Sequence, residues 1–222
     1  MTTRAMSQHR FGSALAATAL LFACVGTAAA QNPKMPSCAE LEKASAEALV
    51  GFLAQDRKGV SDACLEFALR RLWTVQLTPS QANRAVDELF PLLDFPSTMA
   101  NPLFGNINTQ FYVFPARTAL GHATLELGNA EHVQRVVARL IAVVADTTVS
   151  DTVARNAVWV LDGIVGYPNP VGGRLKTVET LIEAARQNAN AFSATRLRAQ
   201  ARRLAQECVG SELRSQCEAA AN

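Results

Sequence analysis

The stretch VSDTVARNAVWVLDGIVG, residues 149–166, has the composition of a helix that is enclosed on all sides. Ser150 stands where its side-chain oxygen can accept a hydrogen bond from the first turn, and Asp151 suits the positive end of the helix dipole. Beyond that start, apolar residues fall on nearly every face, which is typical of a helix packed between neighbours. The stretch therefore predicts an inner helix over 150–165. We expect its core residues to be Val153, Ala157, Val158, Val160, Leu161 and Ile164.

Helical periodicity extends over the rest of the chain. Apolar residues recur at spacings of three and four, and no segment sustains the alternation of a half-buried strand. Two capping boxes, Ser37 to Glu40 and Thr78 to Gln81, mark helix starts, the second with Pro79 at the first helical position. The fold class is thus all-α, with a possible break at Pro115. We expect helices near 37–55, 60–76, 79–94, 110–128, 130–146, 150–165, 174–188 and 192–209, and a short one within 211–220.

A second copy of the opening pattern lies 89 residues upstream. VSDACLEFALRRLW begins at Val60, and both copies continue from V-S-D to an Ala after five residues and a Leu four positions later. Fainter matches divide this interval into units of about 40 residues, which is the period of helical solenoids built from antiparallel helix pairs. The pattern therefore favours a stack of helix pairs.

At these positions the chain resembles the HEAT-like and armadillo-like helical repeats, over residues from about 60 to 209. The resemblance implies a right-handed α-solenoid of antiparallel helix pairs, a fold that usually binds other proteins. The proline expected in the first helix of each pair is missing, and a compact orthogonal helical bundle would give the same pattern, so both architectures stay open. The residues that carry the resemblance are Asp151, Arg155, Ala157, Leu161 and Gly163, with weaker echoes at Arg117, Ala119 and Ala123.

The first thirty residues have the organisation of a secretory signal peptide. Arg4 and Arg10 form a positive start, the apolar stretch 11–25 is too short to cross a membrane, and 28–30 is a small-residue cleavage pattern. The signal predicts a periplasmic or secreted protein of a Gram-negative bacterium. We expect a signal peptide at 1–30, a linker at 31–36, a helical repeat domain at 37–210 and a C-terminal tail or short helix at 211–222.

A lipoprotein signal is the alternative for the same segment. Leu21 to Cys24 resembles the bacterial lipobox, although Phe22 is bulkier than the residue usual at its position. Cys24 would then be acylated and would become the mature N-terminus. In that case the protein would be attached to a membrane through this lipid alone.

Cysteine content fits export. Four cysteines follow residue 30, an even number that suits an oxidising compartment. No C-x-x-C spacing occurs and no His lies near them in sequence, so we expect structural disulfides in preference to a redox or metal site. Four cysteines allow three pairings. We favour Cys38–Cys64 with Cys208–Cys217, because these pairs join neighbouring helices or close a terminus.

The charge balance does not point to a nucleic-acid partner. Loss of Arg4 and Arg10 with the signal peptide takes the formal net charge from +2 to 0. Residues 174–203 nevertheless hold seven basic and two acidic residues. Outside the cytoplasm such a patch favours an acidic protein, an anionic lipid or a cell-wall polymer, although it is also typical of a solvated helix face. The candidate partner-binding arginines are Arg196 and Arg203 on one helix face, and Arg198 and Arg202 on another.

Aromatic residues gather in the longest predicted connection, NPLFGNINTQFYVF at 101–114. Phe104, Phe111 and Tyr112 are candidate partner-binding residues, because aromatic side chains on a long loop can anchor a partner. The alternative is that they fill the groove between repeats.

Catalytic and metal-binding motifs are missing from the sequence. His122 and Glu126 lie one turn apart but lack the further ligands of a zinc site, and Asp87-Glu88 fits a solvated helix face. The sequence contains neither a nucleophile elbow nor a phosphate-binding loop. We therefore expect no catalytic residue, no metal and no cofactor.

These observations predict a non-enzymatic protein that binds another protein in the cell envelope, as a scaffold, adaptor or immunity-type protein. One alternative is a cell-wall-directed hydrolase, for which Glu88, Glu126 and Asp162 are the carboxylates to test. The other is a small-ligand-binding protein.

Substitution of Phe111 and Tyr112 by alanine tests the aromatic loop. We expect partner binding to be lost and the melting temperature to change little, because an exposed anchor contributes to an interface and not to the core. Partner capture and thermal unfolding measure the two effects. A large fall in melting temperature would show instead that the two rings belong to the core.

Overall fold

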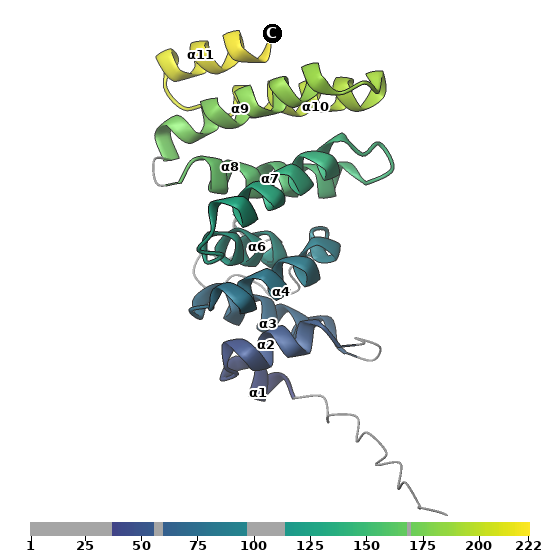
Figure 1. Ribbon diagram of the computed structural model, residues 1–222, viewed down its shortest axis with the longest axis vertical. Coiled ribbons are helices and arrows are strands. Elements are labelled where there is room, and N and C mark those ends of the chain that lie inside the picture. The colour runs from purple at the N-terminus through teal and green to yellow at the C-terminus, as the bar shows by residue number, and fades with distance from the viewer. Residues whose placement is uncertain (1–36, 56–59, 97–113, 168–169) are drawn as a thin grey trace, which may run out of the picture. The chain divides into compact units, whose positions relative to one another are not determined.

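The computed structural model describes residues 37–55, 60–96, 114–167 and 170–222, all within a unit that spans 35–222. These ranges form ten α-helices, one 3₁₀ turn and no strand, so the predicted all-α class is confirmed (Figure 1). The predicted signal peptide, the linker and Cys24 lie outside the described residues. The helices are α1 Cys38–Glu42, α2 Ala46–Leu53, α3 Asp62–Thr74, α4 Pro79–Leu89, α6 Pro115–Leu125, α7 Ala130–Ala145, α8 Asp151–Val165, α9 Pro170–Gln187, α10 Ala191–Gln206 and α11 Ser211–Ala221, with the turn η1 at Phe90–Leu92.

Side-chain caps begin the helices where the sequence predicts. Ser37 and Thr78 complete reciprocal capping boxes with Glu40 and Gln81. Ser150 accepts a hydrogen bond from the backbone N–H of Val153, as expected for the start of α8. Satisfying these otherwise unpaired donors fixes the helix starts locally.

Three predicted helices are too long. The helix over 110–128 begins only at Pro115, where the break was expected, and ends at Leu125. The single helix over 37–55 is wrong, because Ser45 caps a second helix by accepting from the N–H of Ala48 and so divides α1 from α2. The helix over 79–94 ends at Leu89 and continues as η1, since Pro91 has no backbone N–H to donate to the preceding turn.

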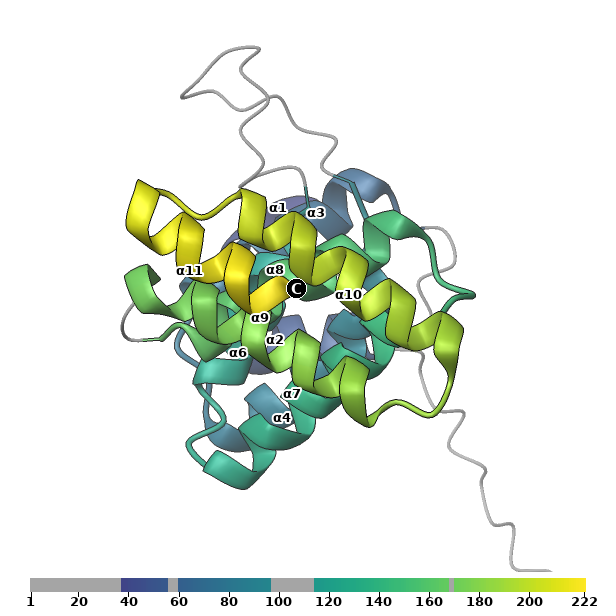
Figure 2. The ribbon, with the colours of Figure 1, turned by 90° about the horizontal axis from the view of Figure 1, so that it is seen from above.

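Packing follows the order of the chain (Figures 1 and 2). The helices pair as α2 with α3, α4 with α6, α7 with α8 and α9 with α10. Contacts of α3 with α6, of α6 with α8, and of α8 with α9 connect one pair to the next, and α11 covers α9 and α10. None of the described helices is long and apolar enough to cross a membrane.

Helix α8 is enclosed as its sequence predicts. It packs against α6, α7 and α9, so that three neighbouring helices cover most of its surface. Val153 is half-buried against the core, whereas the other five predicted core residues are buried. One buried residue of α8, Asn156, is polar.

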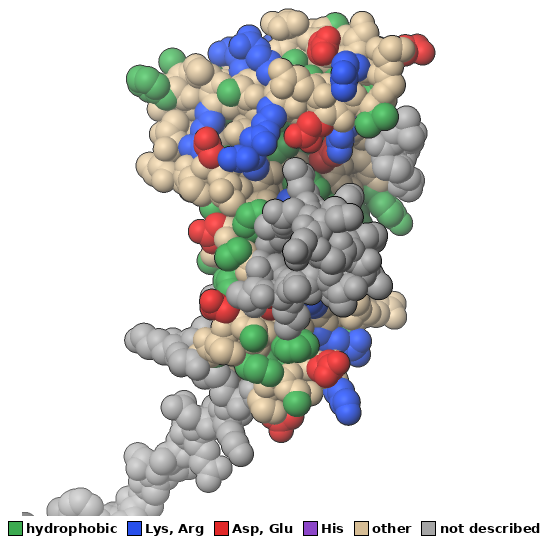
Figure 3. Space-filling view, turned by 180° about the vertical axis from the view of Figure 1, so that it is seen from behind, with side chains coloured by type: hydrophobic (Ala, Val, Ile, Leu, Met, Phe, Trp, Pro, Cys, Tyr) green, Lys and Arg blue, Asp and Glu red, His purple; other side chains and the backbone are tan. Residues whose placement is uncertain are grey.

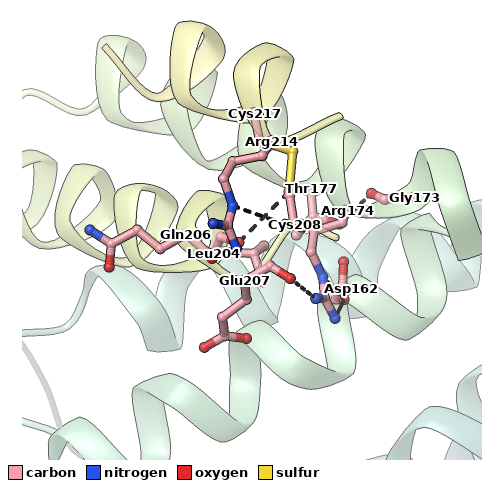
Figure 4. The surroundings of a disulfide bond; sticks show 10 residues. All are labelled: Asp162, Gly173, Arg174, Thr177, Leu204, Gln206, Glu207, Cys208, Arg214 and Cys217. Atoms are coloured by element: carbon pink, nitrogen blue, oxygen red, sulfur yellow. Dashed lines mark hydrogen bonds and ion pairs between the residues drawn. A yellow bond between two sulfur atoms is a disulfide. The ribbon is translucent and has the colours of Figure 1, made fainter. Parts of the chain in front are cut away.

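Both predicted disulfides are confirmed. Cys38–Cys64 connects α1 to α3, and Cys208–Cys217 connects the end of α10 to α11. Around the second bridge, Arg214 of α11 donates to the backbone carbonyls of Cys208 and Gln206 (Figure 4). The C-terminal helix is therefore held both covalently and by hydrogen bonds to the end of α10.

Replacing Cys208 and Cys217 together by serine tests the stabilising role of this bridge. The two residues are separated by 9 positions, and release of so short a loop lowers the free energy of unfolding by about 3 kcal/mol. Urea unfolding of the oxidised wild type and the variant measures the difference. The Cys38 and Cys64 pair, separated by 26, gives a slightly larger expected loss. Unchanged values in both double variants would contradict the prediction.

Candidate binding pocket

A pocket of about 350 Å³ lies among α6, α8, α10 and the beginning of α9. This volume is in the range of small-molecule and side-chain binding sites. Among the described residues that line it are aromatic rings, apolar side chains and two carboxylates, Asp162 and Glu207. The same lining includes four arginines, Arg117, Arg155, Arg174 and Arg203.

Arg117 of α6 is the buried charge of the pocket. Arg117 as a whole is only 5% exposed to solvent, and its Nη1 donates a hydrogen bond of 3.2 Å to Oδ1 of Asn156 on α8. Asn156 is itself buried and donates from Nδ2 to the backbone carbonyl of Leu93. The side-chain amide of Asn156 therefore fixes the guanidinium of Arg117 and also joins α8 to the segment that follows η1.

Two aromatic rings flank the same guanidinium. Its central carbon lies 4.4 Å from the ring centroid of Trp159 and 5.7 Å from that of Phe114. Contacts of this kind are favourable for a cation over an aromatic face. The rings and Asn156 together hold the plane of Arg117 in one orientation.

Arg117 is held in place but is not saturated with hydrogen bonds. Its Nε and Nη2 are buried and have no hydrogen-bond partner among the described residues. Buried donors are paired in the great majority of cases, since an unpaired one costs about 1–3 kcal/mol. Burial lowers the pKa of the Arg117 guanidinium to about 10, so the side chain remains protonated at neutral pH. The pocket thus contains a permanent cation with unused donors.

Arg174 is engaged within the protein. Its Nη2 lies 3.2 Å from Oδ2 of Asp162, and its Nη1 donates to the carbonyl of Glu207 at 2.7 Å (Figure 4). Asp162 is one of the three carboxylates considered for hydrolysis, and here it is the ion-pair partner of Arg174. Glu88 and Glu126 are not among the pocket residues that the structure describes.

The remaining two arginines lie at the exposed rim of the pocket. Arg155 donates from Nε to the carbonyl of Asp151 in its own helix at 3.3 Å. Arg203 lies 3.9 Å from Glu207 in a solvent-exposed pair, which contributes little stability. Both guanidinium groups can therefore turn toward a ligand.

The four arginines predicted on α10 take different positions. Arg203 lines the pocket, whereas Arg196 donates to the backbone carbonyls of Asp146 and Val149 at 2.7 and 2.8 Å. Arg196 thus holds the turn between α7 and α8 against α10. Arg198 and Arg202 are exposed on the opposite side of α10 from the pocket, because each is two residues, or about 200°, from the pocket-lining Gln200.

The other sequence candidates lie elsewhere. Phe104, Phe111 and Tyr112 are outside the described residues. His122 makes a hydrogen bond of 2.8 Å to the carbonyl of Val75, and Asp87 pairs with Arg139. Within the described ranges, no group of three His, Cys, Asp or Glu residues could hold a metal ion.

The sequence did not single out the central residues of the pocket. Arg117 stood out only as a weak echo of the repeat, and neither Asn156 nor Trp159 was a candidate. The available signal was a polar residue at position 156 inside an otherwise apolar inner helix. Its partner lies 39 positions earlier in the sequence, about one repeat away.

No family model matches the chain, and neither the curated proteins nor the solved structures include a significant match. What the fold and the pocket define is a class: an all-α protein with two disulfides and an arginine-rich pocket.

Replacing Arg196 by alanine tests whether this residue stabilises the fold by holding the turn between α7 and α8. Loss of its charge-assisted bonds to backbone carbonyls is expected to lower the free energy of unfolding by about 2 kcal/mol. Arg198→Ala removes the same charge from the exposed side of α10, and is expected to change stability by less than about 0.5 kcal/mol. Urea unfolding compares the two variants. Equal free energies of unfolding for the two variants would show that Arg196 does not stabilise the turn between α7 and α8.

Proposed function

We propose that this is an exported, non-enzymatic protein of HEAT-like type, whose helix pairs form a right-handed solenoid that binds another protein in the bacterial envelope. The architecture is supported by the packing, in which each helix pair contacts the next one along the chain. The export signal in the sequence and the two disulfides support a location outside the cytoplasm.

The observation that carries the proposal is the origin of the pocket arginines. Arg117, Arg155 and Arg203 come from α6, α8 and α10, which are the second helices of three successive pairs. Helix α8 contacts α6 and α9, and α10 contacts α7 and α9, so the pocket lies where these three pairs meet. The extended surfaces that stacked repeats create are where such proteins bind their partners. Lys and Arg side chains lie over the C-terminal helices on the face seen from behind, with Asp and Glu side chains among them (Figure 3). Contributions from three pairs make this surface the best candidate for a binding face.

A small ligand is the second candidate. It is favoured by the volume of the pocket, about 350 Å³, which is sufficient for a compact organic molecule. Such a ligand would raise the melting temperature of the purified protein by mass action.

Capture of the partner with matched charge variants tests the proposed face. The mature protein, tagged at its C-terminus and produced from its own chromosomal locus, would be lightly crosslinked and purified. We expect one stoichiometric protein with the wild type and with the Arg198→Ala/Arg202→Ala control. The pocket variant Arg155→Ala/Arg203→Ala removes the same charge and is expected to lose that protein.

Two results would contradict the proposal. Recovery of the chain alone would remove the protein-binding function. Equal recovery of a partner with both double variants would place binding on a different surface.

A further inference from the structure

We infer that the pocket receives a carboxylate of the partner protein, from an acidic side chain or a chain terminus, and that Arg117 is the residue that binds it. The protein nature of the partner rests on the proposed function. The carboxylate site itself rests on the geometry of the pocket.

The geometry of the unused donors matches a carboxylate. Nε and Nη2 of Arg117, which lack a partner within the described part of the chain, lie on one edge of the planar guanidinium. That edge presents two nearly parallel N–H bonds, a spacing that fits the two oxygens of a carboxylate. The third nitrogen, Nη1, is already bonded to Asn156. The free edge is therefore the one suited to bidentate binding.

The protein also fixes this edge before a ligand arrives. Asn156 is held by the carbonyl of Leu93, and Trp159 lies against the face of the guanidinium. A binding group whose orientation is fixed in advance loses little conformational freedom on binding. The rim arginines Arg155 and Arg203 add longer-range attraction for an anion that approaches the pocket.

The composition of the lining favours an anion that is attached to a carbon chain. Arg174 is occupied by Asp162 and by the backbone carbonyl of Glu207, which leaves the other three arginines to attract the anion. Val158 and Leu204 in the same lining offer apolar surface to the carbon chain that carries the carboxylate.

NMR titration of the mature, ¹⁵N-labelled protein tests the inference with short probes. The probes are acetyl-Ala-Glu-Ala-amide, the Gln peptide of the same length, sodium acetate and inorganic phosphate. The signals followed are the Nε–H of Arg117, assigned by its loss in Arg117→Met, and the indole N–H of Trp159. We expect saturable shifts with the Glu peptide and acetate, none with the Gln peptide, and weaker binding of phosphate than of the Glu peptide.

Three variants locate the binding. Arg203→Ala is expected to weaken the Glu peptide at least fivefold, and Arg117→Met at least tenfold, followed through Trp159. Arg198→Ala removes the same charge outside the pocket and leaves the dissociation constant unchanged. Arg203 is exposed, so its variant remains informative if Arg117→Met fails to fold.

The contrary results are distinct. Four results would each overturn the carboxylate site. The first two are the absence of any shift with the Glu peptide at millimolar concentration and equal binding of the Glu and Gln peptides. The other two are tighter binding of phosphate than of the Glu peptide and equal effects of Arg203→Ala and Arg198→Ala. Binding of the Glu peptide without any captured protein partner would leave the site intact and overturn the proposed function. Capture of a partner that is lost with Arg155→Ala/Arg203→Ala but tolerates Arg117→Met would leave the proposed function intact and overturn the carboxylate site.

Discussion

The burial of one guanidinium constrains the centre of this protein. Arg117 lies between α6 and α8, and Asn156 ties it to the backbone at Leu93. The fall of its pKa to about 10 corresponds to a cost of at most about 3 kcal/mol to the folded state. Because the unfolded chain holds this proton more tightly, the cost is complete below about pH 10 and fades as the pH rises above that value. The surrounding helices must offset it.

Much of the fold follows from local sequence signals. Ser37, Thr78 and Ser150 cap helices because their hydroxyls lie within reach of the backbone N–H groups of the first turn. The disulfide pairing follows from the closeness in the chain of the helices that it joins. The division at Ser45 was missed because Lys43 and Ala44 favour a helix, and this preference outweighed the cap signal.

The pocket was predictable only in part. Helical spacing places Arg196 and Arg203 on one face of α10, but it cannot say what that face contacts. The end of α7 meets Arg196 and occupies it with carbonyls, whereas Arg203 meets the pocket. Arg117 and Asn156 are 39 residues apart, and their contact depends on the stacking of α6 on α8. No local pattern contains that information.

The free energy of unfolding of Arg117→Met, measured in urea at pH 7, tests most directly whether this charge serves a ligand or the fold. Methionine keeps the apolar stem and removes the buried cation, at the expense of one hydrogen bond to Asn156. If Arg117 is retained for binding, the variant should match the wild type within about 2 kcal/mol. A loss of about 4 kcal/mol or more would mean that Arg117 is a structural residue, and would contradict the account.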